Sequence, residues 1–277
     1  MKLVYLGTPE MAVPPLNALV EADHDVVLVV TRADKRRGRG SATSPSPVKA
    51  AALELGLAVT HSVDDVLAAV KNDGAELGVV VAFGQLIKPH VLDVIPMVNL
   101  HFSLLPRWRG AAPVERSLLA GDDVTGVCVM QLEEGLDTGG VYASREVPIG
   151  PETTAADLRE SLVDVGSALL VETLSKPVEL WVGDALPQTG EVTHAAKFGR
   201  GDFEIDWSAT PEEVHRLVRV GGAWTTFRGK RLKILKANLV DERLLPVTVQ
   251  PEGKSAMPFD AWRNGARPGR DELFGDS

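Results

Sequence analysis

The side chains best suited to catalysis lie at the end of an apolar run in the middle of the chain. We predict that residues 95–102 form a buried strand with Asn99 and His101 near its end. Alternate side chains of a strand share a face, so Asn99 and His101 point to one side, and Leu100 and Phe102 point to the other. An amide and an imidazole on one side can donate hydrogen bonds to a developing oxyanion. Such a histidine can equally be a structural residue that bonds a backbone carbonyl.

A second polar group lies downstream, where three glycines surround Asp137 within residues 133–140. A carboxylate near His101 would hold the imidazole in its charged form and accept a proton from an incoming nucleophile. The alternative is an aspartate that hydrogen-bonds the backbone of its own glycine-rich turn. The spacing alone leaves both possibilities open.

Several other kinds of active site are excluded because their sequence motifs are absent. No Gly-x-Ser-x-Gly sequence is present, which argues against a serine hydrolase. The turn after the first strand has one glycine, Gly7, where a dinucleotide-binding fingerprint needs three, so a nicotinamide enzyme is rejected. The 6 histidines include no pair at metal-ligand spacing, and the single cysteine, Cys128, lies in an apolar run. We therefore expect no metal and a buried, inert thiol.

Four motifs contain or border the candidate residues: Asn99-Leu100-His101, Ser103-Leu104-Leu105-Pro106, Arg109-Gly110 and Gly135-Leu136-Asp137-Thr138-Gly139. Together they resemble the folate-dependent formyltransferases, and the resemblance extends over residues 1 to about 175. It implies transfer of a formyl group from 10-formyltetrahydrofolate, a co-substrate, to an amine through a tetrahedral oxyanion. It also implies that Asn99 and His101 stabilise this oxyanion and that Asp137 supports His101.

The resemblance further implies where the folate binds. One loop would lie beneath the pterin and read its ring edge with backbone groups, and a second would border both folate and acceptor. Apolar side chains in the first loop fit a largely apolar slot, although each could equally be ordinary core. The implied folate-binding residues are Phe83, Gly84, Gln85, Leu86, Ile87, Ser103, Leu104, Leu105 and Pro106.

The charge distribution bears on the acceptor. The formal net charge is −9, yet residues 32–39 carry five basic side chains and one acid, and residues 228–236 carry five basic side chains and no acid. Such clusters fit local contact with RNA on an otherwise acidic protein, although either alone could be solvated surface. Residues 44–49 resemble the tRNA-modifying members of this family more than the sugar-modifying ones. Together with the two basic clusters, they favour aminoacylated initiator tRNA, methionyl-tRNA, as acceptor. The expected tRNA-binding side chains are Arg36, Arg37, Arg39, Lys49, Lys230, Arg231 and Lys233.

Two other functions stay open. One is formylation of an amino-sugar nucleotide by a relative with a reduced appendage, and the other is non-catalytic RNA binding on the same scaffold. The presence of Asn99, His101 and Asp137 argues against RNA binding alone. The basic cluster at residues 32–39, which we call the basic loop, and a small β-rich domain at 203–277 argue for tRNA over a sugar.

The elements that must position these residues begin with a β-α-β unit. Strands at residues 2–7 and 25–31 flank a helix at 13–21, which favours a parallel sheet. Strands and helices then alternate up to a long helix capped by Thr154. For residues 1–175 we predict an α/β fold, with an open, mostly parallel, Rossmann-like sheet that carries helices on both faces and forms the catalytic domain.

The remainder divides into a linker at 176–202 and a small β-rich domain at 203–277. Alternation on both sides of Arg228-Gly229-Lys230 predicts a hairpin, followed by a short strand at 246–250. Residues 234–249 are too few for the further strands of the resembled family, so we expect a shortened, incomplete OB-like barrel. Residues 270–277 are expected to be disordered.

The sequence carries no membrane signal. Gly7 and Pro9 interrupt the first apolar residues before a signal peptide can develop, and no run approaches the roughly 18 apolar residues of a membrane span. We expect a cytoplasmic protein without membrane contact, and we take it as a monomer.

Overall fold

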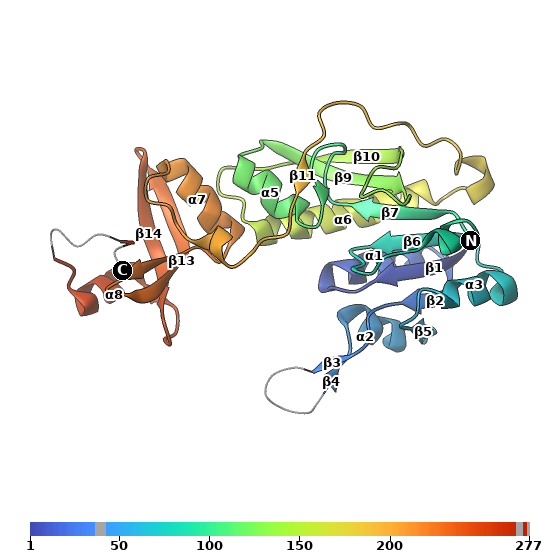
Figure 1. The fold of residues 1–277 in the computed structure, drawn as a ribbon, viewed down its shortest axis with the longest axis horizontal. Coiled ribbons are helices and arrows are strands. Elements are labelled where there is room, and N and C mark those ends of the chain that lie inside the picture. Colours follow the sequence, from blue (N-terminus) through green and yellow to red (C-terminus); the bar gives the residue numbers. More distant parts are fainter. Residues whose placement is uncertain (37–42, 270–273, 276–277) are drawn as a thin grey trace. The chain divides into compact units, whose positions relative to one another are not determined.

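The computed structural model describes residues 1–36, 43–269 and 274–275 (Figure 1). Contacts between residues divide the chain into two compact units. The first comprises Met1–Pro113, Val124–Pro148 and Arg159–Ala195, and the second comprises Val114–Asp123, Ile149–Leu158 and Ala196–Ser277. None of the helices in the described part of the chain is long and apolar enough to cross a membrane.

The first unit is built on a 7-stranded sheet with the order β10-β9-β7-β6-β1-β2-β5. The five strands from β7 to β5 are parallel, whereas β9 pairs with β7 and β10 in the antiparallel sense. The sheet is therefore mostly parallel, as predicted. Its strands are β1 (Lys2–Gly7), β2 (Asp25–Val30), β5 (Val59–Thr60), β6 (Leu77–Val81), β7 (Met97–His101), β9 (Val124–Gln131) and β10 (Val141–Pro148).

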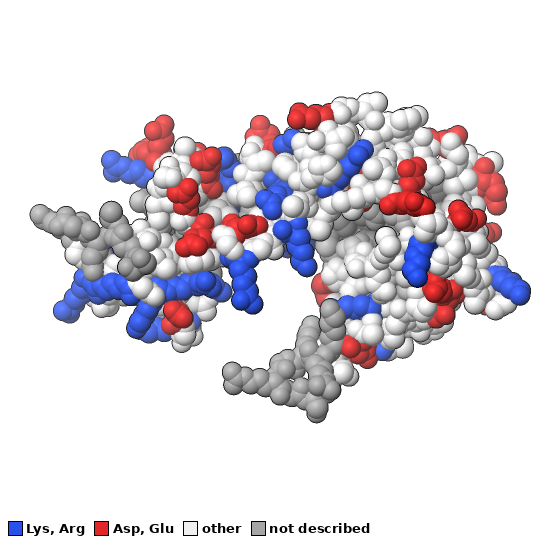
Figure 2. Space-filling view, viewed as in Figure 1, with Lys and Arg blue, Asp and Glu red and all other residues white. Residues whose placement is uncertain are grey.

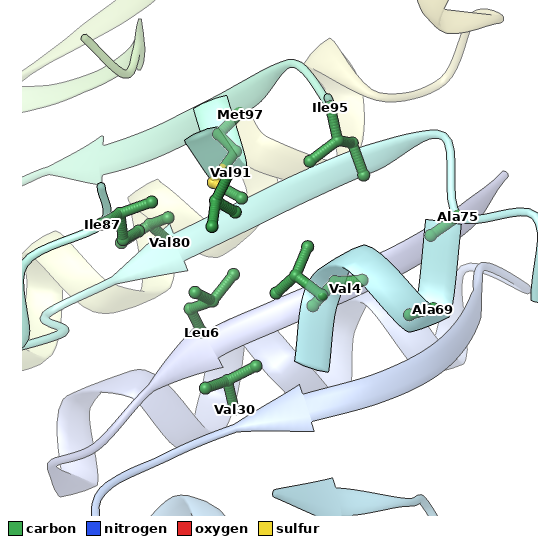
Figure 3. Close-up of a cluster of buried hydrophobic side chains, with 11 residues drawn as sticks. Val4, Leu6, Val30, Ala69, Ala75, Val80, Ile87, Val91, Ile95 and Met97 are labelled. Carbon is green, nitrogen blue, oxygen red and sulfur yellow. The ribbon is translucent and has the colours of Figure 1, made fainter. Parts of the chain in front are cut away.

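Helices lie on both faces of this sheet, which confirms the predicted class. On one face, side chains of β1, β2, β6 and β7 pack with helical elements into an apolar cluster that includes Val4, Leu6, Val80 and Met97 (Figure 3). The opposite face of β7 meets α6, where Gly166 lies against Leu100. The helical elements of this unit are η1 (Glu10–Ala12), α1 (Val13–Glu21), α2 (Pro47–Glu54), α3 (Asp65–Ala68), the π-helix η2 (Ala69–Asp73), α4 (Pro89–Leu92) and, from Arg159 onward, α6 (Ala155–Thr173). Helix α5 (Pro113–Ala120) belongs to the second unit from Val114 onward.

Helix starts follow the sequence signals closely. The Ser46 hydroxyl accepts a hydrogen bond from the backbone N–H of Lys49 at 3.0 Å, with Pro47 in the first turn of α2. Before α6, the Asp157 carboxylate accepts from the backbone N–H of Thr154 at 3.0 Å, and the Thr154 hydroxyl accepts from that of Asp157 at 3.2 Å. The predicted cap at Thr154 is confirmed, and with Asp157 it forms a capping box that has a shorter acid than the usual glutamate.

Short pieces of structure occur where the sequence predicts only connections. The polar connection at residues 32–47 contains β3 (Lys35–Arg36), which pairs with β4 (Thr43–Ser44). The segment expected to be a linker contains the 3-10 turn η3 (Val178–Leu180) and β11 (His194–Ala195), and β11 pairs in parallel with β8 (Arg109–Gly110). Two-residue strands carry too little periodicity to be seen in a sequence.

The second unit contains a 4-stranded antiparallel sheet with the order β12-β13-β14-β15. Arg228 and Gly229, at φ 49° and 69°, form the two-residue turn of the predicted hairpin. In the described residues, no pairing joins β12 to β15, so the sheet is open. The elements are η4 (Gly201–Phe203), α7 (Pro211–Val220), β12 (Trp224–Phe227), β13 (Lys230–Val240), β14 (Arg243–Pro251), β15 (Met257–Pro258) and α8 (Phe259–Ala266).

Two expectations for this unit are wrong. A second tight turn at Asp241-Glu242, with φ of 48° and 58°, joins β13 to a β14 much longer than the predicted strand at 246–250. Neither residue is the asparagine or glycine that usually marks such a turn. The expected terminal disorder fails at Phe274, whose ring stacks on Trp207 with centroids 5.3 Å apart. The rest of that expectation, at 270–273 and 276–277, lies outside the described residues.

The start of α7 provides a test of local stability. The Thr210 hydroxyl accepts from the backbone N–H of Glu213 at 3.3 Å, and the Glu213 carboxylate accepts from that of Thr210 at 2.9 Å. We expect Thr210→Ala to lower the free energy of unfolding by about 1 kcal/mol, because one helix N–H loses its partner. Denaturant titration checks this, with the exposed Ser255→Ala as control. Equal midpoints for the two variants would contradict the capping role.

Candidate active site

The predicted polar pair lies at the carboxyl end of β7, in the middle of the sheet. His101 is buried and Asn99 is half-buried, and both share the face of Met97, which belongs to the apolar cluster of Figure 3. Leu100 faces α6 on the opposite side. The predicted alternation is therefore confirmed. Open α/β sheets bind ligands at this edge, where the strands end and loops begin.

His101 contacts two polar groups, one at each ring nitrogen. Its Nε2 lies 3.0 Å from the backbone oxygen of Trp108, and its Nδ1 lies 3.7 Å from Oδ1 of Asp137. A carbonyl oxygen can only accept, so Nε2 carries the proton of that hydrogen bond. Nδ1 is consequently the atom that faces the carboxylate. Both side chains are shielded, at 6% exposure for His101 and 12% for Asp137.

Asp137 is held in a tight turn. Its backbone is left-handed, at φ 50°, and its Oδ2 accepts a hydrogen bond from the backbone N–H of Gly110 at 2.7 Å. Gly139 is needed beside it, because a Cβ there would lie 2.0 Å from the backbone oxygen of Gln131. The turn therefore aims the carboxylate at His101, while its second oxygen bonds the loop after β7.

The loop at 103–110 is fixed by its own bonds and by a distant segment. The Ser103 hydroxyl donates to the backbone oxygen of Arg107 at 2.6 Å. The backbone N–H of Trp108 donates to Oγ1 of Thr193 at 2.9 Å, and that of Arg109 donates to the Thr193 backbone oxygen at 2.9 Å. Because these hydrogen bonds fix the loop, the Trp108 carbonyl is held in place to accept a bond from the buried imidazole.

Residues 186–195, which we call the strap, take part in this site although their sequence predicts a linker. Besides Thr193, the strap supplies Gln188, whose side chain bonds Arg109 and the turn of Asp137. No motif or period marks these two residues. The segment is marked only by Pro187 and Gly190, which break regular structure, so nothing in the sequence distinguishes Gln188 or Thr193.

The residues implied in folate binding divide by exposure. Ile87 is buried in the apolar cluster and Phe83 packs against it, so these two side chains belong to the core. Leu86 is 77% exposed, and Gly84 and Gln85 are also exposed. In the second loop, Ser103 and Pro106 are buried, and Leu104 and Leu105 are half-buried.

The residues expected to contact tRNA lie in two places. Lys49 pairs with Asp34 at 2.9 Å, and Arg36 lies on β3. Arg37 and Arg39 lie outside the described residues. In the second unit, Lys230, Arg231 and Lys233 are exposed on β13, and Figure 2 shows basic side chains gathered where this sheet lies.

The outward direction of these β13 side chains follows from the pleat. Leu232 and Ile234 are buried, so Arg231 and Lys233 point to solvent between them. The Arg231 guanidinium carbon lies 3.9 Å from the centre of the Trp224 ring, which holds the charge over an aromatic surface.

Thiol and metal chemistry find little support near His101. Cys128 pairs with His101 in the β7–β9 register, but burial raises the pKa of its thiol to about 11, against a smaller lowering by a backbone hydrogen bond from Leu105. A thiol with this pKa is a poor nucleophile at neutral pH, in agreement with the expected inert residue. Among the described residues, no three His, Cys, Asp or Glu side chains gather as a metal site.

Two family models and several curated relatives match this chain. The family model described as formyl transferase matches residues 1–174, and that described as formyl transferase, C-terminal domain, matches residues 197–246. The chain is 45% identical to the methionyl-tRNA formyltransferase of Heliobacterium modesticaldum over 269 residues, covering 93% of this chain and 84% of the relative. It is 42% identical to that of Thermobifida fusca over 310 aligned positions, covering all of both chains.

The last alignment also bears on length. Its 310 positions exceed the 277 residues of this chain, so the relative has segments that this chain lacks. Among solved structures, the fold is similar to an N-formyltransferase of Helicobacter canadensis in complex with folinic acid and dTDP-3-aminofucose. That similarity has a TM-score of 0.66 at 19% identity, covering 87% of this chain and 88% of the other.

The contact between the strap and the loop after β7 can be tested at Gly110. Its φ is +123°, and a Cβ would lie 2.8 Å from the backbone oxygen of Ala195. We expect Gly110→Ala to lower the free energy of unfolding by about 1–3 kcal/mol, because the new methyl strains the backbone. Thermal unfolding measures this, and Gly183→Ala is the matched control because a Cβ there meets nothing within 4 Å. Equal losses in both variants would refute the close packing.

Proposed function

This chain belongs to the formyl transferase family, and from its site we propose that it transfers the formyl group of 10-formyltetrahydrofolate to the α-amino group of methionyl-tRNA. The observation that carries the proposal is the convergence of Asn99, His101 and Asp137 at one end of β7, with His101 Nδ1 facing the carboxylate at 3.7 Å. These groups can stabilise an oxyanion and move a proton, which are the two requirements of formyl transfer to an amine.

The first requirement concerns the oxygen of the formyl group. Attack by the amine makes the formyl carbon tetrahedral and puts negative charge on its oxygen. Asn99 donates an amide hydrogen bond toward this charge. Nε2 of His101 is engaged with the Trp108 carbonyl, so the second, charge-assisted donor is Nδ1 of the protonated imidazole. Donors of this kind, held in place before the reaction, typically contribute about 3–4 kcal/mol each to transition-state stability.

The second requirement concerns the amine proton. The attacking nitrogen becomes positively charged and must lose a proton, and the folate nitrogen must gain one as its bond to the formyl carbon breaks. Asp137 accepts that proton, directly or through a water, and its charge also stabilises a protonated His101 beside it. The fixed N–H of Gly110 on Oδ2 leaves Oδ1 facing the imidazole, so the two oxygens have separate tasks.

The folate fits the loops that border these residues. Leu86 exposes an apolar side chain next to backbone groups of Gly84 and Gln85, which can read the edge of a pterin ring. Phe83 and Ile87 support that loop from the core rather than contacting the ligand with their whole side chains. The second loop, at 103–106, lies between β7 and the residues that bond His101.

The acceptor is favoured by two independent observations. The curated relatives at 42% and 45% identity are named methionyl-tRNA formyltransferases, whereas the sugar-related structure shares only the fold at 19% identity. Exposed Lys230, Arg231 and Lys233 supply positive charge for phosphates on an acidic protein. We take the cytoplasm, where translation is initiated, as the place of action.

The oxyanion role is tested by kinetics of purified protein with 10-formyltetrahydrofolate and methionyl-tRNA. Asn99→Ala and His101→Ala should each lower kcat by about 10²–10³-fold, with little change in folate affinity, because their bonds strengthen only in the transition state. Asp137→Asn should also lower kcat. Asn72→Ala, at an exposed position of η2, is the control. Parallel losses of folate affinity and turnover would contradict this assignment.

The choice of acceptor is tested at the basic loop. Arg37→Glu and Arg39→Glu should raise the KM for tRNA and flatten its salt dependence, because each lost phosphate contact reduces counterion release. Folate affinity should stay constant, and Lys71→Glu on the exposed surface of η2 is the control for charge. An amino-sugar nucleotide that proved the better acceptor, with tRNA kinetics unaffected in these variants, would overturn the proposal.

A further inference from the structure

The Gln188 side chain joins the two loops that carry the candidate catalytic groups. Its Oε1 accepts from the Arg109 guanidinium, at 3.0 Å from Nε and 2.6 Å from Nη2. Its Nε2 donates to the backbone oxygens of Asp137 and Gly139, at 2.8 Å each. One amide therefore makes four hydrogen bonds, two with each loop.

The chemistry of these partners requires glutamine. A guanidinium has only donors and two carbonyl oxygens have only acceptors, so the residue between them must accept at one end and donate twice at the other. A primary amide does both. Glutamate, of the same size, would keep the bond to Arg109 but would set a carboxylate oxygen against two carbonyl oxygens. Methionine would fill the space and make none of the four bonds.

These bonds complete a closed ring through the site. Gln188 bonds the main chain of Asp137, the Asp137 carboxylate bonds the N–H of Gly110, and Gly110 is covalently joined to Arg109, which bonds Gln188 again. Asp137 is thus held by its main chain and by its side chain. Its left-handed backbone, at φ 50°, is costly for a non-glycine residue and persists only where neighbours hold it.

The strap is attached independently of Gln188. On one side Leu186 and Val141 exchange backbone hydrogen bonds of 2.8 and 2.9 Å, and on the other β11 pairs with β8. Thr193 adds its own bonds to the loop after β7. Loss of the Gln188 amide therefore leaves the strap in place and removes only the side-chain connection between Arg109 and the turn of Asp137.

We propose that Gln188 is a positioning residue for formyl transfer, which holds the Asp137 carboxylate at the distance and orientation that His101 and the attacking amine require. The inference rests on the proposed function, because it assigns Gln188 an effect on catalysis through Asp137. A misplacement of about 1 Å in a catalytic group can cost about 100-fold in rate. The strap is then part of the active site rather than a connection between parts of the chain.

The test compares Gln188→Glu with Gln188→Met at saturating folate and methionyl-tRNA. Both should lower kcat about 10–100-fold with KM values within about twofold of the original, because the substrates bind elsewhere while the carboxylate moves. Glutamate should not rescue activity, although it retains the contact with Arg109. Full activity in Gln188→Glu would overturn the proposal, because it would show that the bonds to Asp137 and Gly139 are dispensable.

A double-mutant cycle separates positioning from general stability. In a chain that already carries Asp137→Asn, Gln188→Met should change kcat less than twofold, since the group it positions is gone. An additive loss would mean that Gln188 supports the fold and not Asp137, and would overturn the proposal. Asn72→Ala in both backgrounds is the control.

A second readout is independent of turnover. NMR signals of the His101 imidazole nitrogens should shift in Gln188→Glu and Gln188→Met, because the charge at 3.7 Å moves. Shifted signals in a protein that formylates no tRNA would support the positioning role while refuting the proposed function. Unshifted signals, with normal turnover in the original chain, would refute the positioning role alone.

Discussion

The site depends on the way that one buried imidazole is held from both sides. The Trp108 carbonyl fixes Nε2 of His101 at 3.0 Å and so leaves Nδ1 to face Asp137. An unpaired polar atom in this buried position would cost on the order of 1–3 kcal/mol, so each partner must stay in place. The loop after β7 and the turn at Asp137 are consequently bound to one another, and the sheet underneath supplies a rigid base.

Most of the groups that hold this imidazole and its carboxylate partner are main-chain atoms. The N–H of Gly110, the oxygen of Trp108 and the oxygens of Asp137 and Gly139 all take part. Glycine is needed at positions 110 and 139, because a Cβ there would lie 2.8 Å and 2.0 Å, respectively, from a neighbouring backbone oxygen. Hydrogen bonds from Gln188 of the strap offset the strain of the left-handed backbone at Asp137.

The charge distribution distinguishes the proposed catalytic groups from the side chains proposed to bind the acceptor. The groups at the end of β7 are shielded, whereas Lys230, Arg231 and Lys233 are exposed on β13. Shielding strengthens hydrogen bonds at the reacting atoms, and exposure lets basic side chains reach the phosphates of a long polyanion. An overall charge of −9 is therefore compatible with an RNA substrate, because the positive charge is local.

The sequence by itself determined the features that depend on near neighbours along the chain. These include the parallel β-α-β start, the shared face of Asn99 and His101, and the hairpin at Arg228-Gly229. Strand alternation, capping side chains and turn residues act within a few positions, so their patterns can be read directly. The two-residue turn at Asp241-Glu242 was not predicted, because glutamate stands at the position where glycine usually marks such a turn.

The tertiary structure alone decided which distant groups meet. The approach of Asp137 to His101, the insertion of Gln188 between Arg109 and Asp137, and the packing of Phe274 on Trp207 leave no periodic signal. Each arises because a buried donor, acceptor or aromatic face needs a partner, and the partner can come from any part of the chain that the fold brings near. Local patterns therefore specified the scaffold, and the satisfaction of buried groups specified the site.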